Sequence, residues 1–430
     1  MNVKAVIKKV MDTPTEPVGK VAIAYSGGLD SSLAIELLRR KYRAKQIVAI
    51  TINVGQGAEE IDLGNKKAAK LGIKPILIDA RREFCADWLP KAIRANSDYN
   101  GYPVSTSMTR QLVARIVALE ARRRGCDAVL EGSTGRGNDQ YRMHNVFKMF
   151  APELQILVPV REFDLTRSEE EQLCKAWGVP VQEDIRGGDD KTMWCRSIAS
   201  GAIGLNVKLP DRIWQWLVPP VKAKASGEKL TIEFVEGVPV RMNGKKMPLD
   251  KLVEALNPIA GRNGIGRIDM FEDGIMDLKS REIYEAPAAH VILKLHRDLE
   301  AQCLTKEQIR FKQIVEQRWA YMTYHGEWYH PLKENLDAFI ADSQRFVTGT
   351  FVVQMYKGNI DIVSRESAMS LFNPEIRDIN RSGFDQRWCT NAANVRGLPF
   401  EILARRNEMV AAAAEKKAQR KAKKSRKRRK

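Results

Sequence analysis

The chain has 430 residues, of which 44% are hydrophobic and 29% charged, a composition typical of a soluble globular protein with two or more domains. No apolar run approaches the roughly 20 residues that span a bilayer, and the N-terminus lacks the apolar core of a secretory signal, so we expect no membrane segment. The six cysteines form no CxxC pair, so we expect neither a zinc site nor a disulfide framework, and a cytoplasmic location.

The net charge of +18 is concentrated at the C-terminus. Residues 411–430 hold eleven Lys or Arg and one Glu, a net charge of +10, which leaves +8 for the other 410 residues. This tail has no apolar side chain larger than Ala, so it cannot bury enough surface to offset its ordering entropy. We therefore expect a disordered or frayed helical tail that attracts nucleic acid only non-specifically, in preference to a dedicated RNA-binding arm.

Strand and helix patterns alternate in the first half of the chain. Apolar strands are expected at residues 21–26, 47–53, 75–80, 127–134 and 155–160. Helical spacing of apolar residues is found at 31–42, 58–71, 106–124 and 166–178, the last of which begins with the capping box Thr166 and Glu169. This alternation predicts an α/β domain with a parallel sheet that is covered on both faces.

The pattern changes beyond a Gly- and Pro-bearing region at about residues 185–225. Antiparallel hairpins are expected at 229–246, at 268–280 and at 348–364. Helices are expected at 249–260, 288–304, 306–324 and 331–346. This half is therefore predicted to be α+β, and it ends in a helical segment that leads into the basic tail.

The strongest single motif, Ser26-Gly27-Gly28-Leu29-Asp30-Ser31-Ser32, lies between an apolar strand and an amphipathic helix. The glycines let the backbone fold closely around phosphate oxygens, and the helix N-terminus directs free N–H groups at an anion. Asp30 can bond to the loop backbone or help to hold Mg²⁺. The motif is not a Walker A loop, since no GxxxxGK[ST] is present. A plain strand-to-helix turn explains it less well than a phosphate-binding loop.

Two further segments are rich in polar side chains. Residues 102–110, YPVSTSMTR, lie at the entry to a predicted helix, where hydroxyl groups suit a carboxylate. Residues 132–142 follow a predicted strand and combine glycines, a hydroxyl, an amide, a carboxylate and two guanidinium groups. A structural turn rarely needs so many different groups, whereas a site for an amino acid must pair both a carboxylate and an ammonium. These segments predict such a site.

The phosphate loop resembles that of the N-type ATP pyrophosphatases, which cleave ATP to AMP and pyrophosphate while they adenylate an oxygen of a substrate. YPVSTSMTR and STGRGNDQYR are similar to the substrate motifs of the argininosuccinate synthase family, and GRNGIGRIDMFED, LKSREIYEAP and VTGTFVVQMYKGN extend the resemblance over about residues 20–400. It implies an adenine nucleotide α hydrolase-like domain, a synthetase domain and a C-terminal helix used in homotetramer assembly. The expected parts are an N-terminal extension (1–19), an ATP-binding domain (20–182), a synthetase domain (183–400) and a C-terminal helix with the basic tail (401–430).

The resemblance also implies a role for individual residues. ATP would contact Ala24, Tyr25, Ser26, Gly27, Gly28, Leu29, Asp30, Ser31, Ser32, Ile52 and Gly132. Citrulline would contact Tyr102, Ser107, Asn138, Arg142, Ser197, Glu272 and Tyr284. Aspartate would contact Thr134, Asn138 and Asp139. The chemistry would depend on Asp30, Asn138, Asp139 and Arg142, with ATP as co-substrate, Mg²⁺ on its phosphates and no dedicated metal-ligand set.

The reaction that the family resemblance implies has two steps. The ureido oxygen of citrulline attacks the α-phosphate of ATP and releases pyrophosphate, and the amine of aspartate then attacks the citrulline-adenylate and releases AMP. No histidine lies in a matched motif, so we expect positioning and charge stabilisation to provide most of the catalysis.

The chain departs from the family pattern at three positions, besides Ser31, which replaces a Thr in the phosphate loop and keeps the hydroxyl. Gly188 replaces a serine that contacts citrulline, and the loss of one hydrogen bond costs about 1 kcal/mol. Glu131 stands where His is frequent, and Arg136 replaces a frequent Lys. These departures and the basic tail leave three alternatives open: an aspartate ligase for a related ureido or carbamoyl acceptor, a tRNA-modifying pyrophosphatase, and an inactive homologue that binds a partner or nucleic acid.

Overall fold

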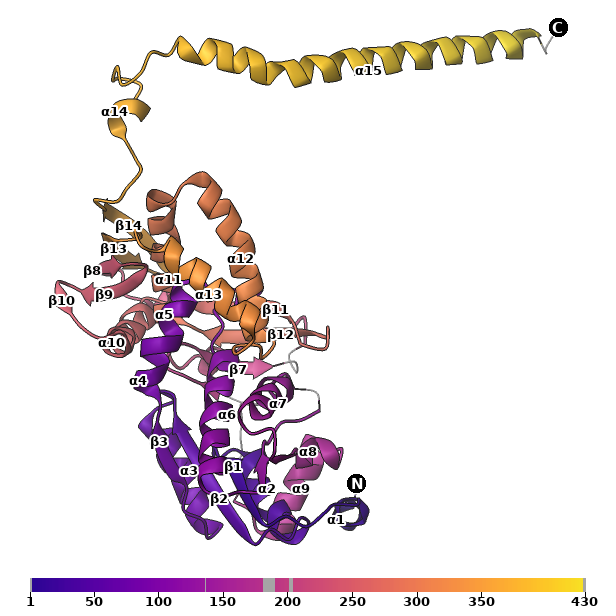
Figure 1. Ribbon diagram of the computed structural model, residues 1–430, viewed down its shortest axis with the longest axis vertical. Helices are drawn as coiled ribbons and strands as arrows, with labels where there is room; N and C mark the ends of the chain where they lie inside the picture. The colour runs from indigo at the N-terminus through magenta and orange to yellow at the C-terminus, as the bar shows by residue number, and fades with distance from the viewer. Residues whose placement is uncertain (1, 136, 181–189, 201–203, 428–430) are drawn as a thin grey trace. The chain divides into compact units, whose positions relative to one another are not determined.

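The computed structural model describes residues 2–135, 137–180, 190–200 and 204–427 (Figure 1). The chain divides into two compact units, Met1–Leu371 and Phe372–Lys430, and each is described by itself. Across the described ranges, no helix has both the length and the apolar character that a membrane span needs.

The first part of the larger unit is built on a five-stranded parallel sheet in the order β3-β2-β1-β4-β5. Its strands are β1 (Lys20–Ala24), β2 (Gln46–Asn53), β3 (Ile76–Asp79), β4 (Ala128–Leu130) and β5 (Gln155–Leu157). The parallel sheet predicted from the alternating pattern is confirmed. The predicted strand 127–134 is too long, because the chain leaves the sheet after Leu130 to form the polar segment that begins at Glu131.

Helices cover both faces of this sheet, because side chains that alternate along each strand point to opposite sides. One face, with Ala22 and Val129, packs under α6 (Thr106–Arg123) and α7 (Asp139–Phe150). The other face, with Val21 and Leu130, packs under helices at the beginning and end of the domain. These are α1 (Val3–Asp12), α2 (Leu29–Arg40), α8 (Pro159–Glu162) and α9 (Arg167–Trp177). The expected capping box of Thr166 and Glu169 is confirmed at the start of α9.

Parallel strands end at the same edge of a sheet, so the loops that follow β1, β2 and β4 meet at the carboxyl edge. Helix α3 (Ala58–Lys70) follows β2. A helical insertion between β3 and α6 comprises α4 (Arg81–Glu83), the π-helical turn η1 (Phe84–Trp88) and α5 (Leu89–Arg94). Helix α5 extends from this domain and packs against helices of the second part (Figure 1).

The second part contains two antiparallel sheets. The four-stranded sheet has the order β11-β12-β7-β6 and comprises β6 (Asp190–Lys191), β7 (Arg196–Ser200), β11 (Arg267–Asp273) and β12 (Lys279–Glu285). The five-stranded sheet has the order β10-β9-β8-β13-β14 and comprises β8 (Glu228–Val235), β9 (Val238–Met242), β10 (Lys245–Lys246), β13 (Gly349–Tyr356) and β14 (Asn359–Glu366). All three predicted hairpins are confirmed by this pairing.

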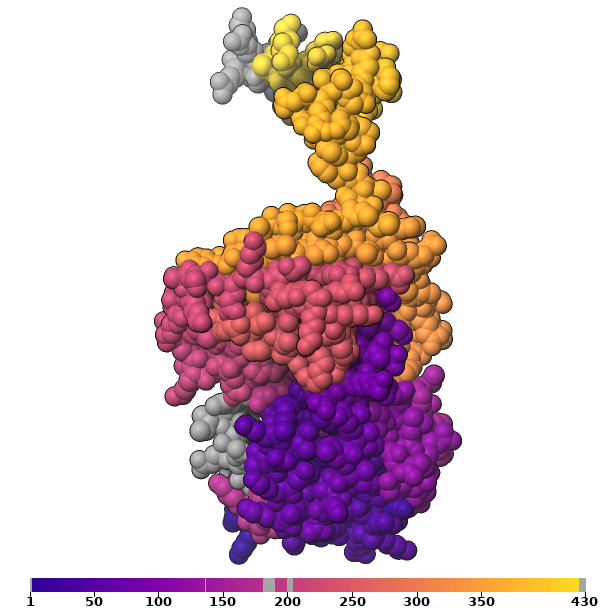
Figure 2. All heavy atoms as spheres, turned by 90° about the vertical axis from the view of Figure 1, so that its left-hand side faces the viewer, coloured from indigo at the N-terminus to yellow at the C-terminus, as the bar shows by residue number. Residues whose placement is uncertain are grey.

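Four long helices complete this part: α10 (Leu249–Arg262), α11 (Pro287–Cys303), α12 (Lys306–Tyr324) and α13 (Pro331–Ser343). Short 3₁₀ turns η2 (Asp211–Ile213) and η3 (Pro220–Lys222) lie between β7 and β8. Figure 2 shows the first part, in indigo to purple, against the second part, in pink to orange, without a break between them. The family resemblance implied this order of an α/β domain and an α+β domain.

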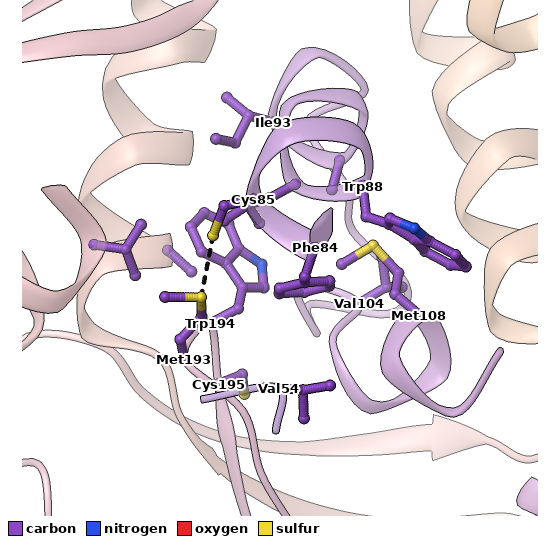
Figure 3. Packing of buried hydrophobic residues seen from close by; sticks show 14 of the residues in the cluster. Val54, Phe84, Cys85, Trp88, Ile93, Val104, Met108, Met193, Trp194 and Cys195 are labelled. Atoms are coloured by element: carbon purple, nitrogen blue, oxygen red, sulfur yellow. Dashed lines mark hydrogen bonds between the residues drawn. The ribbon is translucent and has the colours of Figure 1, made fainter. Parts of the chain in front are cut away.

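A buried cluster joins the two parts. Met193, Trp194 and Cys195, which follow β6, pack on η1 and on the start of α6 (Figure 3). The thiol of Cys85 lies 3.1 Å from the sulfur of Met193. The segment 190–195 is thereby held across the carboxyl edge of the parallel sheet.

The smaller unit is helical. It contains α14 (Pro374–Arg377) and the 40-residue α15 (Trp388–Lys427), whose described side chains, from Trp388 to Lys424, are exposed. The basic tail is therefore helical as far as Lys427, with its side chains exposed as far as Lys424.

Candidate active site

The loop between β1 and α2 has the backbone of an anion-binding turn. Gly27 has φ +77°, and a Cβ atom there would lie 2.5 Å from the Cα atom of Gly64 on α3, so only glycine fits. Lys67 donates a 2.8 Å hydrogen bond to the carbonyl of Gly27. Gly28 occupies the N-cap of α2 and provides no side-chain cap, which leaves the first N–H groups of the helix available to an anion.

Hydroxyl groups fix the shape of this loop. The backbone N–H of Gly28 donates to Ser26 Oγ at 3.2 Å, and the same oxygen lies 3.2 Å from Ser31 Oγ. Thr51 on β2 donates to the carbonyl of Tyr25 at 2.8 Å. The loop is thus preorganised by its own serines and by its neighbouring strand.

Asp30 lies in the first turn of α2, where its carboxylate pairs with Arg167 at 2.5 Å. Glu170 on α9 is buried nearby. Burial, with the negative charge of Asp30 as a further cause, raises the pKa of Glu170 to about 9.

The structure brings the other two predicted nucleotide residues to the same edge of the sheet. A Cβ atom on Gly132 would lie 3.5 Å from the Cβ atom of Asp30 and 3.6 Å from the backbone nitrogen of Ser31. The residue that follows Glu131 at the end of β4 therefore lies within van der Waals range of the loop. Ile52 is buried near the end of β2, two residues beyond the partner of Ala24.

Asp139 is held between two guanidinium groups at the start of α7. Its Oδ2 atom accepts from Arg110 Nε at 2.7 Å, and its Oδ1 atom accepts from Arg142 Nη1 at 2.9 Å. Burial alone would raise the pKa of this carboxyl group, but Arg110 and Arg142 hold the pKa below its usual value. A second carboxylate, Asp190 on β6, lies 2.5 Å from Arg110 Nη2.

Asn138, the N-cap residue of α7, connects this cluster to the second part of the unit. Its side chain donates to Tyr324 Oη at 2.7 Å and accepts from the backbone N–H of Ile275 at 2.9 Å. Arg142 donates to the carbonyl of Tyr324 at 2.8 Å, and its guanidinium lies 4.6 Å from the centre of the Tyr324 ring. Thr134 lies in the preceding turn, where its carbonyl accepts from the N–H of Gly137.

Glu272 on β11 and Tyr284 on β12 are joined through their side chains, although in the register of the hairpin Glu272 pairs with Ser280 and Tyr284 with Ile268. The hydroxyl of Tyr284 donates to Glu272 Oε2 at 2.8 Å, and Tyr324 donates to the other oxygen. Burial raises the pKa of Glu272, and the hydrogen bonds from Tyr324 and Tyr284 oppose that rise. Ser197 on β7 pairs in register with Tyr284 on one side and with Asp190 on the other.

Two hydroxyl groups lie at the N-terminus of α6. Tyr102 Oη accepts from the N–H groups of Ser105 and Thr106 at 2.7 and 2.8 Å, so its own proton remains available for donation. The Tyr102 ring stacks on Tyr284 with a centroid separation of 4.3 Å. Ser107 Oγ is buried and has no hydrogen-bond partner within the described ranges. Such an orphaned group fits a site that a polar ligand completes.

Glu131, between β4 and Gly132, is fully buried, and neither of its carboxyl oxygens has a hydrogen-bond partner in the described part of the chain. Burial raises its pKa to about 9, with Arg161 opposing the rise and Asp139 adding to it. Arg136 and Gly188, the other departures from the family pattern, lie outside the described residues.

Four features of the site were not predicted from the sequence. They are the ion pairs of Arg110 and Asp190, the hydrogen bonds of Tyr324, and the raised pKa of Glu131. The only indication in the sequence that Arg110 belongs to the site is its position at the end of the polar segment 102–110. Tyr324 lies at the end of a helix far along the chain and is brought in by tertiary packing alone. Within the described ranges, no group of three His, Cys, Asp or Glu side chains is arranged to hold a metal ion.

The parallel sheet, the uncapped glycine loop and the neighbouring ion cluster define a nucleotide-binding α/β protein with an adjoining site for polar ligands. Residues 20–180 match the family model described as the arginosuccinate synthase N-terminal HUP domain, and residues 189–403 match that of the C-terminal domain. The chain therefore belongs to the argininosuccinate synthase family.

Curated relatives match along nearly their full length. The argininosuccinate synthase of Methanopyrus kandleri is 40% identical over 90% of this chain and 100% of its own. Those of Methanocaldococcus jannaschii and Dehalococcoides mccartyi are each 41% identical, over 87% and 90% of this chain and 95% and 96% of theirs.

Proposed function

We propose that this protein is an ATP-dependent ligase that joins citrulline to aspartate and releases argininosuccinate, AMP and pyrophosphate. Family membership supports this activity. The observation that carries it is that the glycine loop and the Asp139 cluster lie at one edge of one sheet, joined through Gly132. A nucleotide on the loop would therefore have its phosphates beside a site for amino acids.

ATP would bind with its phosphates against the free N–H groups at the start of α2 and the hydroxyls of Ser26, Ser31 and Ser32. Mg²⁺ fits this arrangement, because it favours phosphate oxygens, water and one or two carboxylates over an all-protein cage. Asp30 is the carboxylate beside the loop, and it would hold the ion together with the phosphates. When bound, Mg²⁺ would neutralise phosphate charge.

Citrulline would place its carboxylate at the N-terminus of α6. Tyr102 and Ser107 would donate there, since the proton of Tyr102 and the hydroxyl of Ser107 are not consumed by the protein. Glu272 would pair the ammonium group, in a charge-assisted contact that Tyr284 orients. Ser197, Asn138 and Arg142 would complete the contacts.

Aspartate would bind at the start of α7, between Thr134, Asn138 and Asp139. Asp139 is kept ionised by two guanidinium groups, so it suits an ammonium group. Arg142 would attract carboxylate charge from the same helix turn.

With these placements, the ureido oxygen of citrulline attacks the α-phosphorus of ATP and the bond to pyrophosphate breaks. The amine of aspartate then attacks the ureido carbon, the carbon–oxygen bond breaks, and AMP leaves with that oxygen. Asn138, Asp139 and Arg142 would hold the reacting groups in line, and this positioning, together with stabilisation of charge, would provide most of the rate enhancement. Asp30 would contribute at the phosphate end.

We further propose a cytoplasmic homotetramer, with α15 as the assembly helix. Trp388, Phe400 and Met409 on this helix are exposed large apolar side chains, which a partner chain would cover. We also propose that the functional parts of the chain end at residues 19, 182 and 400. A related ureido or carbamoyl acceptor is the second candidate, and the missing hydroxyl at Gly188 motivates it.

The test is the release of pyrophosphate from ATP with citrulline, with aspartate, with both, with carbamoyl analogues of citrulline, and with tRNA. Our proposal requires sustained release only when citrulline and aspartate are both present, together with argininosuccinate detected by mass spectrometry. Turnover with a different acceptor, or with tRNA, in folded protein would refute it.

A further inference from the structure

Arg110 on α6 is shared by two carboxylates. Its Nε atom donates to Asp139 at 2.7 Å, and its Nη2 atom donates to Asp190 at 2.5 Å. The planar guanidinium holds both contacts with fixed geometry, which a lysine ammonium does not reproduce. Asp139, Arg110 and Asp190 therefore form one ion triad.

The two carboxylates belong to different parts of the proposed site. Asp139 begins α7 in the domain with the parallel sheet. Asp190 belongs to β6 of the antiparallel sheet, where it pairs in register with Ser197. Arg110 is thus a direct polar link between the proposed aspartate subsite and the strand pair on the citrulline side.

The residues that follow Asp190 are anchored to the domain with the parallel sheet. Lys191 pairs with Glu60 on α3, and Thr192 Oγ1 lies 2.7 Å from Ser105 Oγ at the start of α6. The N–H of Met193 donates to the carbonyl of Val54 at 3.3 Å. The contacts of Thr192 and Met193 therefore tie the strand that carries Asp190 to the domain that carries Arg110.

The contact between Asp190 and Arg110 depends on the balance of charge around the triad. Arg142 also pairs with Asp139, so two cations serve two carboxylates. Burial and the charge of Asp139 raise the pKa of Asp190, whereas Arg110 lowers it. Asp190 and Asp139 thus share the charge of Arg110, so a change in the contact of Asp190 with Arg110 alters the electrostatic field at Asp139.

We propose that Arg110 is a positioning residue that couples the two amino-acid subsites, so that citrulline bound at Ser197 changes the affinity for aspartate at Asp139 through Asp190 and Arg110. This inference rests on the proposed function. Coupling of this kind is reciprocal, and each substrate must change the affinity for the other by the same factor.

The test is calorimetric titration of the full-length protein with aspartate, in the presence of an ATP analogue that cannot be cleaved between its α- and β-phosphates. Each titration is run without citrulline and with saturating citrulline. For the native protein we expect citrulline to change the dissociation constant of aspartate by about tenfold. The coupling ratio is the dissociation constant of aspartate without citrulline divided by its value with citrulline. For Asp190→Asn we expect this ratio to be about one, because the amide carries no charge with which to compete for the guanidinium of Arg110.

Lys191→Gln is the matched control, because it removes a charge and an ion pair from the same strand without touching Arg110. It should keep the native ratio. Arg110→Lys is the second variant, and its coupling ratio should also be about one. It tests the inference independently if Asp190→Asn fails to fold. The inference is overturned if the native protein binds both substrates without coupling, if Asp190→Asn or Arg110→Lys keeps the coupling, or if Lys191→Gln loses it. A native protein that binds no citrulline would instead overturn the proposed function.

Discussion

Glu131 offers a sharp test of the electrostatics of this site. Its side chain is fully buried beside Gly132, and its pKa is raised to about 9, chiefly by burial, from an ordinary value of 4.5. Because the pKa is higher in the folded state, the stability linked to this group is fully present below about pH 4.5 and is lost as the pH rises towards 9. Glu131→Gln keeps the size of the side chain and removes the titration.

The size of this loss of stability follows from the pKa values of Glu131 in the unfolded and the folded state. Each unit of difference is worth about 1.4 kcal/mol, so Glu131 costs the folded state about 3 kcal/mol at pH 7 relative to acid solution. Between about pH 5.5 and pH 7.5, the difference in free energy of unfolding between Glu131→Gln and the native protein should grow by about 2–3 kcal/mol. If the nucleotide domain unfolds as a unit, this corresponds to a change of about 5 °C or more in the difference between their melting temperatures.

Thermal unfolding of both proteins across this pH range measures the effect. Glu307→Gln, at an exposed position on α12, is the control and should show a difference that is independent of pH. A melting-temperature difference between Glu131→Gln and the native protein that stays constant with pH would show that Glu131 is ionised or solvated, contrary to the buried geometry.

Three other substitutions test separate parts of the site. Gly27→Ala places a methyl group against Gly64 and should weaken ATP binding, measured by calorimetry, by at least about tenfold; unchanged ATP affinity would contradict the loop geometry. Ser107→Ala removes a buried hydroxyl without a partner in the described structure, so the melting temperature should hold or rise while the KM for citrulline increases about fivefold or more. A lower melting temperature with an unchanged KM would assign Ser107 a structural role. Tyr324→Phe removes a hydrogen bond that lowers the pKa of Glu272, so the KM for citrulline should worsen more in acid than in alkaline solution; equal effects at both pH values would count against ion pairing by Glu272.

The regular elements were largely predictable, because their apolar periodicity is strong. The strand expected at 47–53 is β2, and the helix expected at 306–324 is α12 with the same bounds. Helix α7 was not predicted, because its first residues read as a polar binding segment. Its buried face, Met143, Val146 and Phe147, nevertheless has helical spacing. Helix α1 was also missed, although Val6 and Val10 lie four residues apart and are buried.

The glycine turn at residues 26–32 could be predicted, because the residues that form it are contiguous in the sequence. Contacts of Glu272 and Tyr284 with citrulline were implied by the family resemblance. Their hydrogen bond to each other was not predicted, because the hairpin pairs Glu272 with Ser280 and Tyr284 with Ile268, and only the long tyrosine side chain brings the two together. Tyr324 could not be predicted, because its contacts with Asn138, Arg142 and Glu272 depend on where the end of α12 packs. Local patterns carry no information about such a position.

The most direct test of the proposed chemistry follows one oxygen atom. Citrulline labelled with ¹⁸O in its ureido group is incubated with ATP, aspartate and the protein, and the products are examined by mass spectrometry. Attack of this oxygen on the α-phosphorus predicts that the label appears in the phosphate of AMP and is absent from pyrophosphate and argininosuccinate. AMP without the label, formed alongside argininosuccinate, would contradict a citrulline-adenylate and with it the proposed mechanism.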